Sequence, residues 1–183
     1  MKRSLTWANG LTALRLFAAP VLVAAIHAER PLFASGVFFF AVGTDIADGW
    51  VARRFAQVTP FGGFIDHAVD ATFVCAGTAA LAVSGALPAV LPAMIAVAFV
   101  QYAADSGNPA RRSLRPSALG RWNGIAYYAI VAVPIVRDAL GLEWPGAALV
   151  SALGWLLVGT TGISMADRLR RVLRSRTDPG SPV

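Results

Sequence analysis

Charged residues are scarce in this chain. They make up 14% of its 183 residues, while 56% are hydrophobic and the mean hydropathy is +0.60. A soluble globular domain usually carries about 25% charged residues, so the sequence lacks the polar surface that would face water on all sides. Cysteine is scarcer still, because Cys75 is alone and lies in an apolar run. These shortages exclude an intrachain disulfide, favour a buried structural thiol, and argue against a water-soluble domain.

The apolar residues gather into six long runs, each near the length of about 20 residues that a helix needs to cross a bilayer. The runs cover 10–28, 31–52, 60–83, 86–104, 120–140 and 145–166. Helix-breaking residues separate them, as in Ser84-Gly85 and the segment from Gly141 to Pro145. The sequence therefore predicts an all-α integral membrane protein with six transmembrane helices in residues 1–169 and a basic, partly disordered tail in 170–183.

The first run needs a separate interpretation, because Met1-Lys2-Arg3 followed by apolar residues has the outline of a signal peptide. Arg15 interrupts this run, however. We therefore expect the first span to be retained.

The basic residues predict the orientation in the membrane. The chain has 16 lysines and arginines, a net charge of +6 and a pI near 10.7. With the N-terminus inside, only Arg30 and Arg137 lie on the outer side. The positive-inside rule then predicts that both termini are cytoplasmic, in the inner or cell membrane. Because the basic residues lie at the ends of apolar runs and form no aromatic-interleaved patch, we expect no nucleic-acid partner.

Four carboxylates lie inside apolar runs, where an ionised side chain is costly and marks a candidate functional site. Asp45 and Asp48 are three residues apart, and Asp66 and Asp70 are four apart, so each pair shares one face of its helix. Both pairs fall within about two turns of the same membrane surface. Carboxylates at one depth repel each other unless cations bind between them, and oxygen ligands favour Mg²⁺ or Mn²⁺. The pattern predicts a metal site that faces the cytoplasm.

Two alternatives compete with this hypothesis. The acids could pair with arginines or reach toward the interface, which would suffice for one aspartate but is less suited to four on two matched faces. The chain could instead be a transporter whose buried acids line an ion pathway. That alternative predicts acids throughout the membrane depth, whereas these four lie near one surface.

The spacing of these residues resembles a known signature. The fixed positions are Asp45-x2-Asp48-Gly49-x2-Ala52-Arg53-x8-Gly62-x3-Asp66-x3-Asp70. All eight match the signature of the CDP-alcohol phosphotransferase family. The resemblance implies transfer of a substituted phosphate from a CDP-alcohol, commonly CDP-diacylglycerol, to a hydroxyl acceptor, with release of CMP, in phospholipid biosynthesis. It also implies a homodimer. A member that has lost catalysis and acts as a subunit is a further alternative.

The resemblance also implies roles for individual residues. Asp45 and Asp66 would bridge two metal ions, Asp48 would complete one site, and Asp70 would complete the other and act as general base. The stretch from Asn9 to Arg15 is similar to the family's N-terminal segment, which lies beside the nucleotide. The residues expected to contact the CDP group are Asn9, Thr12, Gly49, Ala52, Arg53, Thr59 and Gly62.

The acceptor is less defined. A cluster of Arg111, Arg112, Arg115 and Arg121 would suit an acceptor that bears phosphate, although ordinary cytoplasmic loop charge also explains each arginine singly. Family members that make phosphatidylglycerol phosphate commonly have proline and lysine where this chain has His67 and Ala71. This departure leaves glycerol 3-phosphate open as the acceptor. His67 could contact the acceptor, but a structural role is the simpler interpretation.

Overall fold

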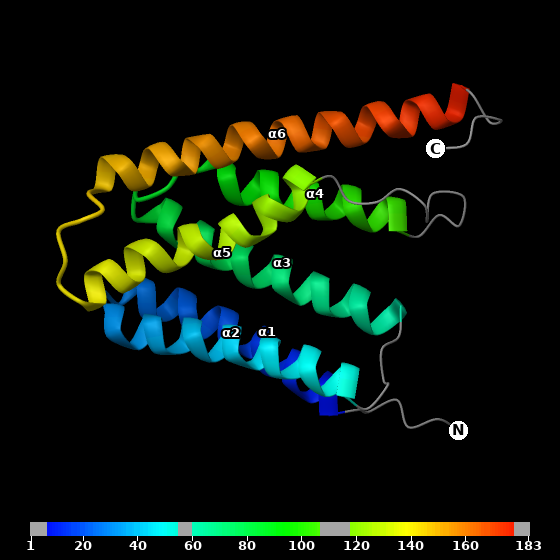
Figure 1. The fold of residues 1–183 in the computed structure, drawn as a ribbon. Helices are drawn as coiled ribbons and strands as arrows, with labels where there is room; N and C mark the ends of the chain where they lie inside the picture. The colour runs from blue at the N-terminus through cyan, green and yellow to red at the C-terminus, as the bar shows by residue number, and fades with distance from the viewer. Residues whose placement is uncertain (1–6, 55–59, 107–117, 178–183) are drawn as a thin grey trace.

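The computed structural model describes residues 7–54, 60–106 and 118–177, with side chains at 14–47, 54, 62–104 and 119–173. In this part of the chain every regular element is an α-helix. The helices are α1 (Trp7–His27), α2 (Pro31–Arg54), α3 (Pro60–Val83), α4 (Val90–Ser106), α5 (Ala118–Ala139) and α6 (Ala147–Thr177). They correspond to the six predicted runs, and α3 coincides with 60–83. Consecutive helices run in opposite directions, so residues 7 and 177 lie at the same end of the bundle (Figure 1).

Glycines terminate two of the helices at the opposite end of the bundle. Gly85 follows α3 with a φ of 77°, and Gly141 follows α5 with a φ of 63°. A glycine in this left-handed conformation commonly ends a helix because it has no Cβ to clash. The residue after Gly85 closes the end of α3, because the Ala86 amide donates a hydrogen bond of 2.9 Å to the carbonyl of Leu81. The predicted breaks after the third and fifth runs are therefore confirmed.

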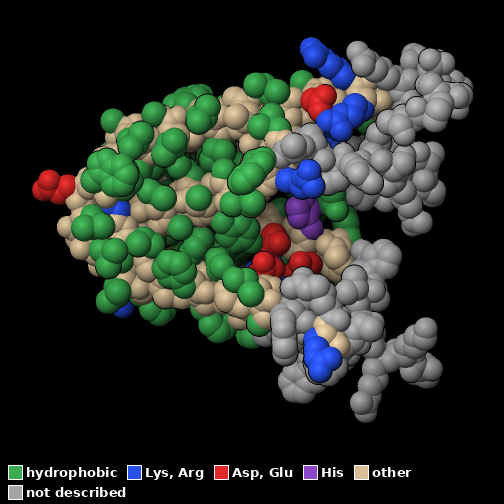
Figure 2. Space-filling model, in the orientation of Figure 1, with side chains coloured by type: hydrophobic (Ala, Val, Ile, Leu, Met, Phe, Trp, Pro, Cys, Tyr) green, Lys and Arg blue, Asp and Glu red, His purple; other side chains and the backbone are tan. Residues whose placement is uncertain are grey.

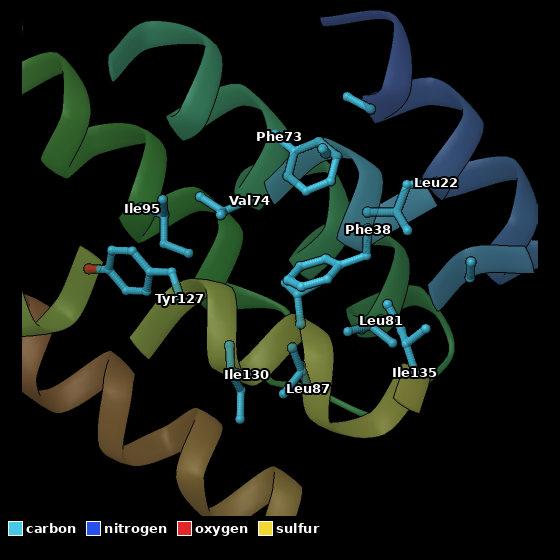
Figure 3. Packing of buried hydrophobic residues seen from close by; sticks show 14 of the residues in the cluster. Leu22, Phe38, Phe73, Val74, Leu81, Leu87, Ile95, Tyr127, Ile130 and Ile135 are labelled. Atoms are coloured by element: carbon cyan, nitrogen blue, oxygen red, sulfur yellow. The ribbon is translucent and has the colours of Figure 1, made fainter. Parts of the chain in front are cut away.

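Helix α3 lies at the centre of the bundle and packs against α1, α4 and α5. Leu22 from α1, Phe38 from α2 and Phe73 from α3 are buried and point toward one another (Figure 3). The rings of Phe38 and Phe73 lie 6.0 Å apart between centroids. Helix α6 lies on the other side, against α4 and α5. The core is thus built from the helices that carry the predicted acids.

The outer surface of the bundle is apolar. Phe17, Leu32 and Val83 are each more than two-thirds exposed, and hydrophobic side chains cover most of the body in Figure 2. Two described segments are long and apolar enough to cross a membrane, Gly62–Val83 and Ala147–Leu173. Three shorter apolar helices are Leu14–His27, Pro31–Ala47 and Val90–Ala104. An apolar exterior of this extent suits contact with lipid, while the number of spans and the side of the termini stay predictions.

Helix α6 is longer than its apolar run. The run ends at 166, yet the helix continues to Thr177 and contains 31 residues. An ion pair between Asp167 and Arg171, one turn apart, supports the extension. At a rise of about 1.5 Å per residue, α6 is about 46 Å long and exceeds the hydrocarbon thickness of about 30 Å. The boundary expected at residue 170 falls inside this helix.

Candidate functional site

Three of the four predicted aspartates meet in the structure. Asp45 comes from α2, and Asp66 and Asp70 come from successive turns of α3. One carboxylate oxygen from each lies within 4.8 Å of the other two. The four-residue spacing on α3 places both of its acids on one face, and that face is turned toward α1 and α2. We call these three residues the acidic cluster.

An arginine from α1 lies in the middle of the acidic cluster. Its Nη1 is 2.7 Å from Asp45 Oδ1 and also donates a hydrogen bond to Asp70 Oδ1, while Nη2 donates to Asp66 Oδ1 at 2.8 Å. This residue, Arg15, is completely buried. A buried guanidinium is tolerated only when carboxylates compensate its charge, and here three of them do so.

Pairing of the acids with an arginine, the alternative that the four matched aspartates made less suited than a metal site, is therefore present in the structure. The sequence signal was a single cation interrupting an apolar run. Arg15 lies five residues, about one and a half turns, after the start of its run, at the depth that the spacing gives to the acids. A charge at that depth requires a partner.

The close approach of α1 and α3 brings Arg15 between the acids. Gly77 lies two turns beyond Asp70 on α3, and Leu22 lies two turns beyond Arg15 on α1. A Cβ at position 77 would lie only 3.4 Å from Leu22 Cδ2 and 2.9 Å from Val131 Cγ1 on α5. The missing side chain at Gly77 therefore lets three helices meet directly below the acidic cluster.

A cavity of about 550 Å³ adjoins the acidic cluster. Asp45 and Asp70 line it, together with Arg121 from α5 and with Arg168 and Arg171 from α6. Figure 2 shows acidic, histidine and basic side chains gathered at one end of the apolar body. The cavity thus carries carboxylates and guanidinium groups on the same lining, which suits a ligand with both metal-binding and anionic groups.

Aromatic contacts organise the basic part of the cavity. The His67 ring meets the Tyr102 ring edge-on, with centroids 4.5 Å apart. Arg168 Cζ lies 5.3 Å from the centroid of the same tyrosine, within the range of a cation–π interaction. His67 therefore lines the cavity next to Asp66, and the tyrosine connects it with a cation from α6.

Polar groups also line the inner part of the cavity. The hydroxyl of Tyr127 and that of Thr161 are hydrogen-bonded at 2.7 Å. Asn123 is buried, and its Nδ2 has no hydrogen-bond partner in the part of the chain that the structure describes. Buried donors in proteins are almost always satisfied. This amide is therefore suited to a water molecule or to a polar atom of a ligand in the cavity.

The remaining predicted site residues divide into two groups. Arg121 lines the cavity, and Gly62 lies on α3 one turn before Asp66. The other predicted residues have side chains outside the described part of the chain: Asn9, Thr12, Asp48, Gly49, Ala52, Arg53, Thr59, Arg111, Arg112 and Arg115. Arg168 and Arg171 were missed as cavity residues, because their positions fit ordinary cytoplasmic charge and only packing of α6 brings them to the cavity.

Comparison with known proteins gives consistent matches. The profile of the family described as CDP-alcohol phosphatidyltransferase matches residues 5–165. A probable phosphatidylglycerophosphate synthase of Mycobacterium tuberculosis is 31% identical over 176 residues, covering 91% of this chain and 81% of the relative. A CMP-forming cardiolipin synthase of Oryza sativa is 27% identical over 191 residues, covering 93% of this chain and 58% of the relative. A CDP-diacylglycerol–glycerol-3-phosphate 3-phosphatidyltransferase of Pseudomonas fluorescens is 36% identical over 93 residues, covering 49% of this chain and 48% of the relative.

Proposed function

The chain belongs to the CDP-alcohol phosphatidyltransferase family, and from this membership we propose that it transfers a phosphatidyl group from CDP-diacylglycerol to a phosphate-bearing alcohol and releases CMP. The observation that carries the proposal is one cavity lined by two members of the acidic cluster and by three arginines. Family membership favours an enzyme of phospholipid biosynthesis over the transporter that the sequence alone left open.

The donor set of the acidic cluster fits divalent cations. Its three carboxylates offer hard oxygen ligands within 4.8 Å of one another, as Mg²⁺ and Mn²⁺ prefer. The Arg15 guanidinium supports this fit, because it shows that the three carboxylates together hold one positive charge between them. We propose that Asp45, Asp66 and Asp70, with Asp48 from the family signature, hold two ions. When bound, the ions would neutralise the diphosphate and polarise the phosphorus that is attacked.

Asp70 is the residue that we propose as general base. Its side chain is 22% exposed, compared with 37% for Asp45 and 41% for Asp66, and it lines the cavity. There it would accept the proton of the acceptor hydroxyl. The acceptor oxygen would form a bond to the phosphorus that carries diacylglycerol, and the bond from that phosphorus to the bridging oxygen would break. CMP would leave with the bridging oxygen.

The arginines support an acceptor that itself carries phosphate. Arg121 and Arg168 come from different helices and line the same cavity as Asp70. A guanidinium binds phosphate oxygens with two parallel hydrogen bonds. We propose that these two side chains hold the acceptor phosphate while the acceptor hydroxyl lies near Asp70. Glycerol 3-phosphate, the acceptor in the name of the Pseudomonas relative, is the first candidate. This chain nevertheless has His67 and Ala71 where members that make phosphatidylglycerol phosphate commonly have proline and lysine.

We also propose that all six helices span the membrane with the cavity facing the cytoplasm. The strong excess of basic residues on one side supports this orientation. CDP would then reach the acidic cluster from the cytoplasm, and the acyl chains would remain in the lipid.

The decisive experiment measures CMP release by the purified protein with CDP-diacylglycerol and Mn²⁺ or Mg²⁺. Glycerol 3-phosphate, glycerol, inositol and phosphatidylglycerol serve as acceptors. We expect release with a phosphorylated acceptor and complete loss with excess EDTA. Release that persists in EDTA would exclude the metal mechanism, and no release with any acceptor would favour the non-catalytic subunit.

A further inference from the structure

The position of Arg15 conflicts with the position of a metal ion. Its Nη1 and Nη2 contact Oδ1 of Asp45 at 2.7 Å and Oδ1 of Asp66 at 2.8 Å, and Nη1 also contacts Oδ1 of Asp70. Mg²⁺ coordinates oxygen at about 2.0–2.1 Å. An ion held by the same three oxygens would therefore lie in the space that the guanidinium occupies.

Charge gives a second reason for the conflict. The three carboxylates carry three negative charges, and the guanidinium cancels one of them. A divalent ion next to a buried guanidinium would meet a like charge at close range with little water to screen it. The completely buried side chain can neither be hydrated in place nor share these oxygens with an ion at low energetic cost.

We propose that Arg15 is an exchangeable internal counter-ion. In the metal-free protein its guanidinium holds the acidic cluster together, and metal binding displaces it from the three carboxylates. The inference rests on the metal site of the proposed function. Arg15 then has two opposite effects: it stabilises the protein without metal, and it competes with the metal for the same oxygens. It is a positioning residue, because it acts through the carboxylates.

The test compares wild type with Arg15→Gln in detergent, using the full chain. Thermal unfolding is measured in EDTA and in Mn²⁺, and Mn²⁺ binding is measured from the electron paramagnetic resonance signal of the free ion. We expect Arg15→Gln to unfold at a lower temperature than wild type in EDTA and at a similar temperature in saturating Mn²⁺. We also expect its Mn²⁺ affinity to rise on the order of tenfold, because one unit charge at contact distance has left the site.

Two further variants make the comparison specific. Arg30→Gln removes the same charge from the exposed turn between α1 and α2, and we expect wild-type behaviour in both measurements. Arg15→Lys keeps one positive charge but lacks the planar fork that reaches three carboxylates. It should be less stable than wild type in EDTA and equal to it in Mn²⁺, so it provides the same readout if Arg15→Gln does not fold.

The outcomes separate the inference from the proposed function. Equal destabilisation of Arg15→Gln or Arg15→Lys in EDTA and in Mn²⁺ would show a fixed structural ion pair and overturn the exchange alone. A Mn²⁺ affinity of Arg15→Gln that equals or falls below that of wild type would also overturn the exchange alone. A wild-type protein that binds no Mn²⁺ would overturn both the metal site and the exchange.

Discussion

Replacing Gly77 by alanine tests the packing directly below the acidic cluster. The new Cβ would lie 2.9 Å from Val131 Cγ1, 3.2 Å from Val131 Cγ2 and 3.4 Å from Leu22 Cδ2. Carbon atoms normally make contact at about 3.5–4.0 Å, so the contact with Leu22 is close to ordinary, whereas α5 must move away from α3 by about half an ångström or more to relieve the contacts with Val131. Val131 and Leu22 are completely buried, and a β-branched valine has few alternative rotamers. Val131 therefore cannot yield by rotation alone.

The magnitude follows from two opposing effects. Overfilling a packed core costs about 1–3 kcal/mol, while alanine in place of glycine within a helix gains about 0.5–1 kcal/mol. We expect a net loss of about 1 kcal/mol and at most about 2.5 kcal/mol, at roughly 2–4 °C in Tm for each kcal/mol in a chain of this size. Because Arg15 and Asp70 are two turns away on the same pair of helices, CMP release should also fall.

The assay is thermal unfolding in detergent, followed by intrinsic fluorescence. Gly159→Ala is the matched control, since nothing lies within 4 Å of a Cβ at that position of α6, and it should leave Tm unchanged or raise it. Gly77→Ala combined with Val131→Ala should lose less stability than the sum of the single changes, because the second substitution removes the clashing methyl groups. If Gly77→Ala is as stable as Gly159→Ala, the three helices do not meet at this point.

Three further predictions concern the proposed function. Asp70→Asn should lower CMP release by about 10²- to 10⁴-fold with nucleotide binding largely kept, whereas Asp45→Asn should lose both; near-normal turnover of Asp70→Asn would exclude it as the base. Arg168→Gln should raise KM for a phosphorylated acceptor with little change in kcat, and an unchanged KM would remove it from the acceptor site. In a Cys75→Ala background, single cysteines in the connector between α4 and α5 should resist membrane-impermeant reagents in intact cells, and labelling from outside would reverse the orientation.

The sequence predicted the helices well because their limits are set locally. Several runs ended where glycines or prolines lie between apolar segments, as at Ser84-Gly85, and α3 matched its predicted range, although Pro20 and Pro134 lie inside α1 and α5 without ending them. The proximity of Asp66, Asp70 and Asp45 was also predictable, since helical spacing and shared depth are local properties. The extension of α6 was missed because its apolar run stops at 166, although the Asp167–Arg171 pair and the absence of proline between Pro145 and Pro179 favour a continued helix.

The rest of the site depends on how each helix is rotated about its own axis. In a membrane both the lipid-facing and the protein-facing sides of a helix are apolar, so periodicity does not reveal which side turns inward. The insertion of Arg15 between the acids and the position of Arg168 on the cavity result from packing between residues far apart in the chain. Only the three-dimensional arrangement brings Arg15 to the acidic cluster and Arg168 to the adjoining cavity.

The unbroken length of α6 fixes the angular direction of its basic residues. Each residue turns an α-helix by about 100° and advances it by about 1.5 Å. One residue inserted near Trp155, in the apolar half of α6, would therefore turn Arg168 and Arg171 about a quarter of a circle or more relative to the cavity. Seven inserted residues would nearly restore their direction but carry them about 10 Å farther along the axis. The orientation of the cavity's guanidinium groups is thus set by the residue count of the apolar half of α6, which lies outside the cavity.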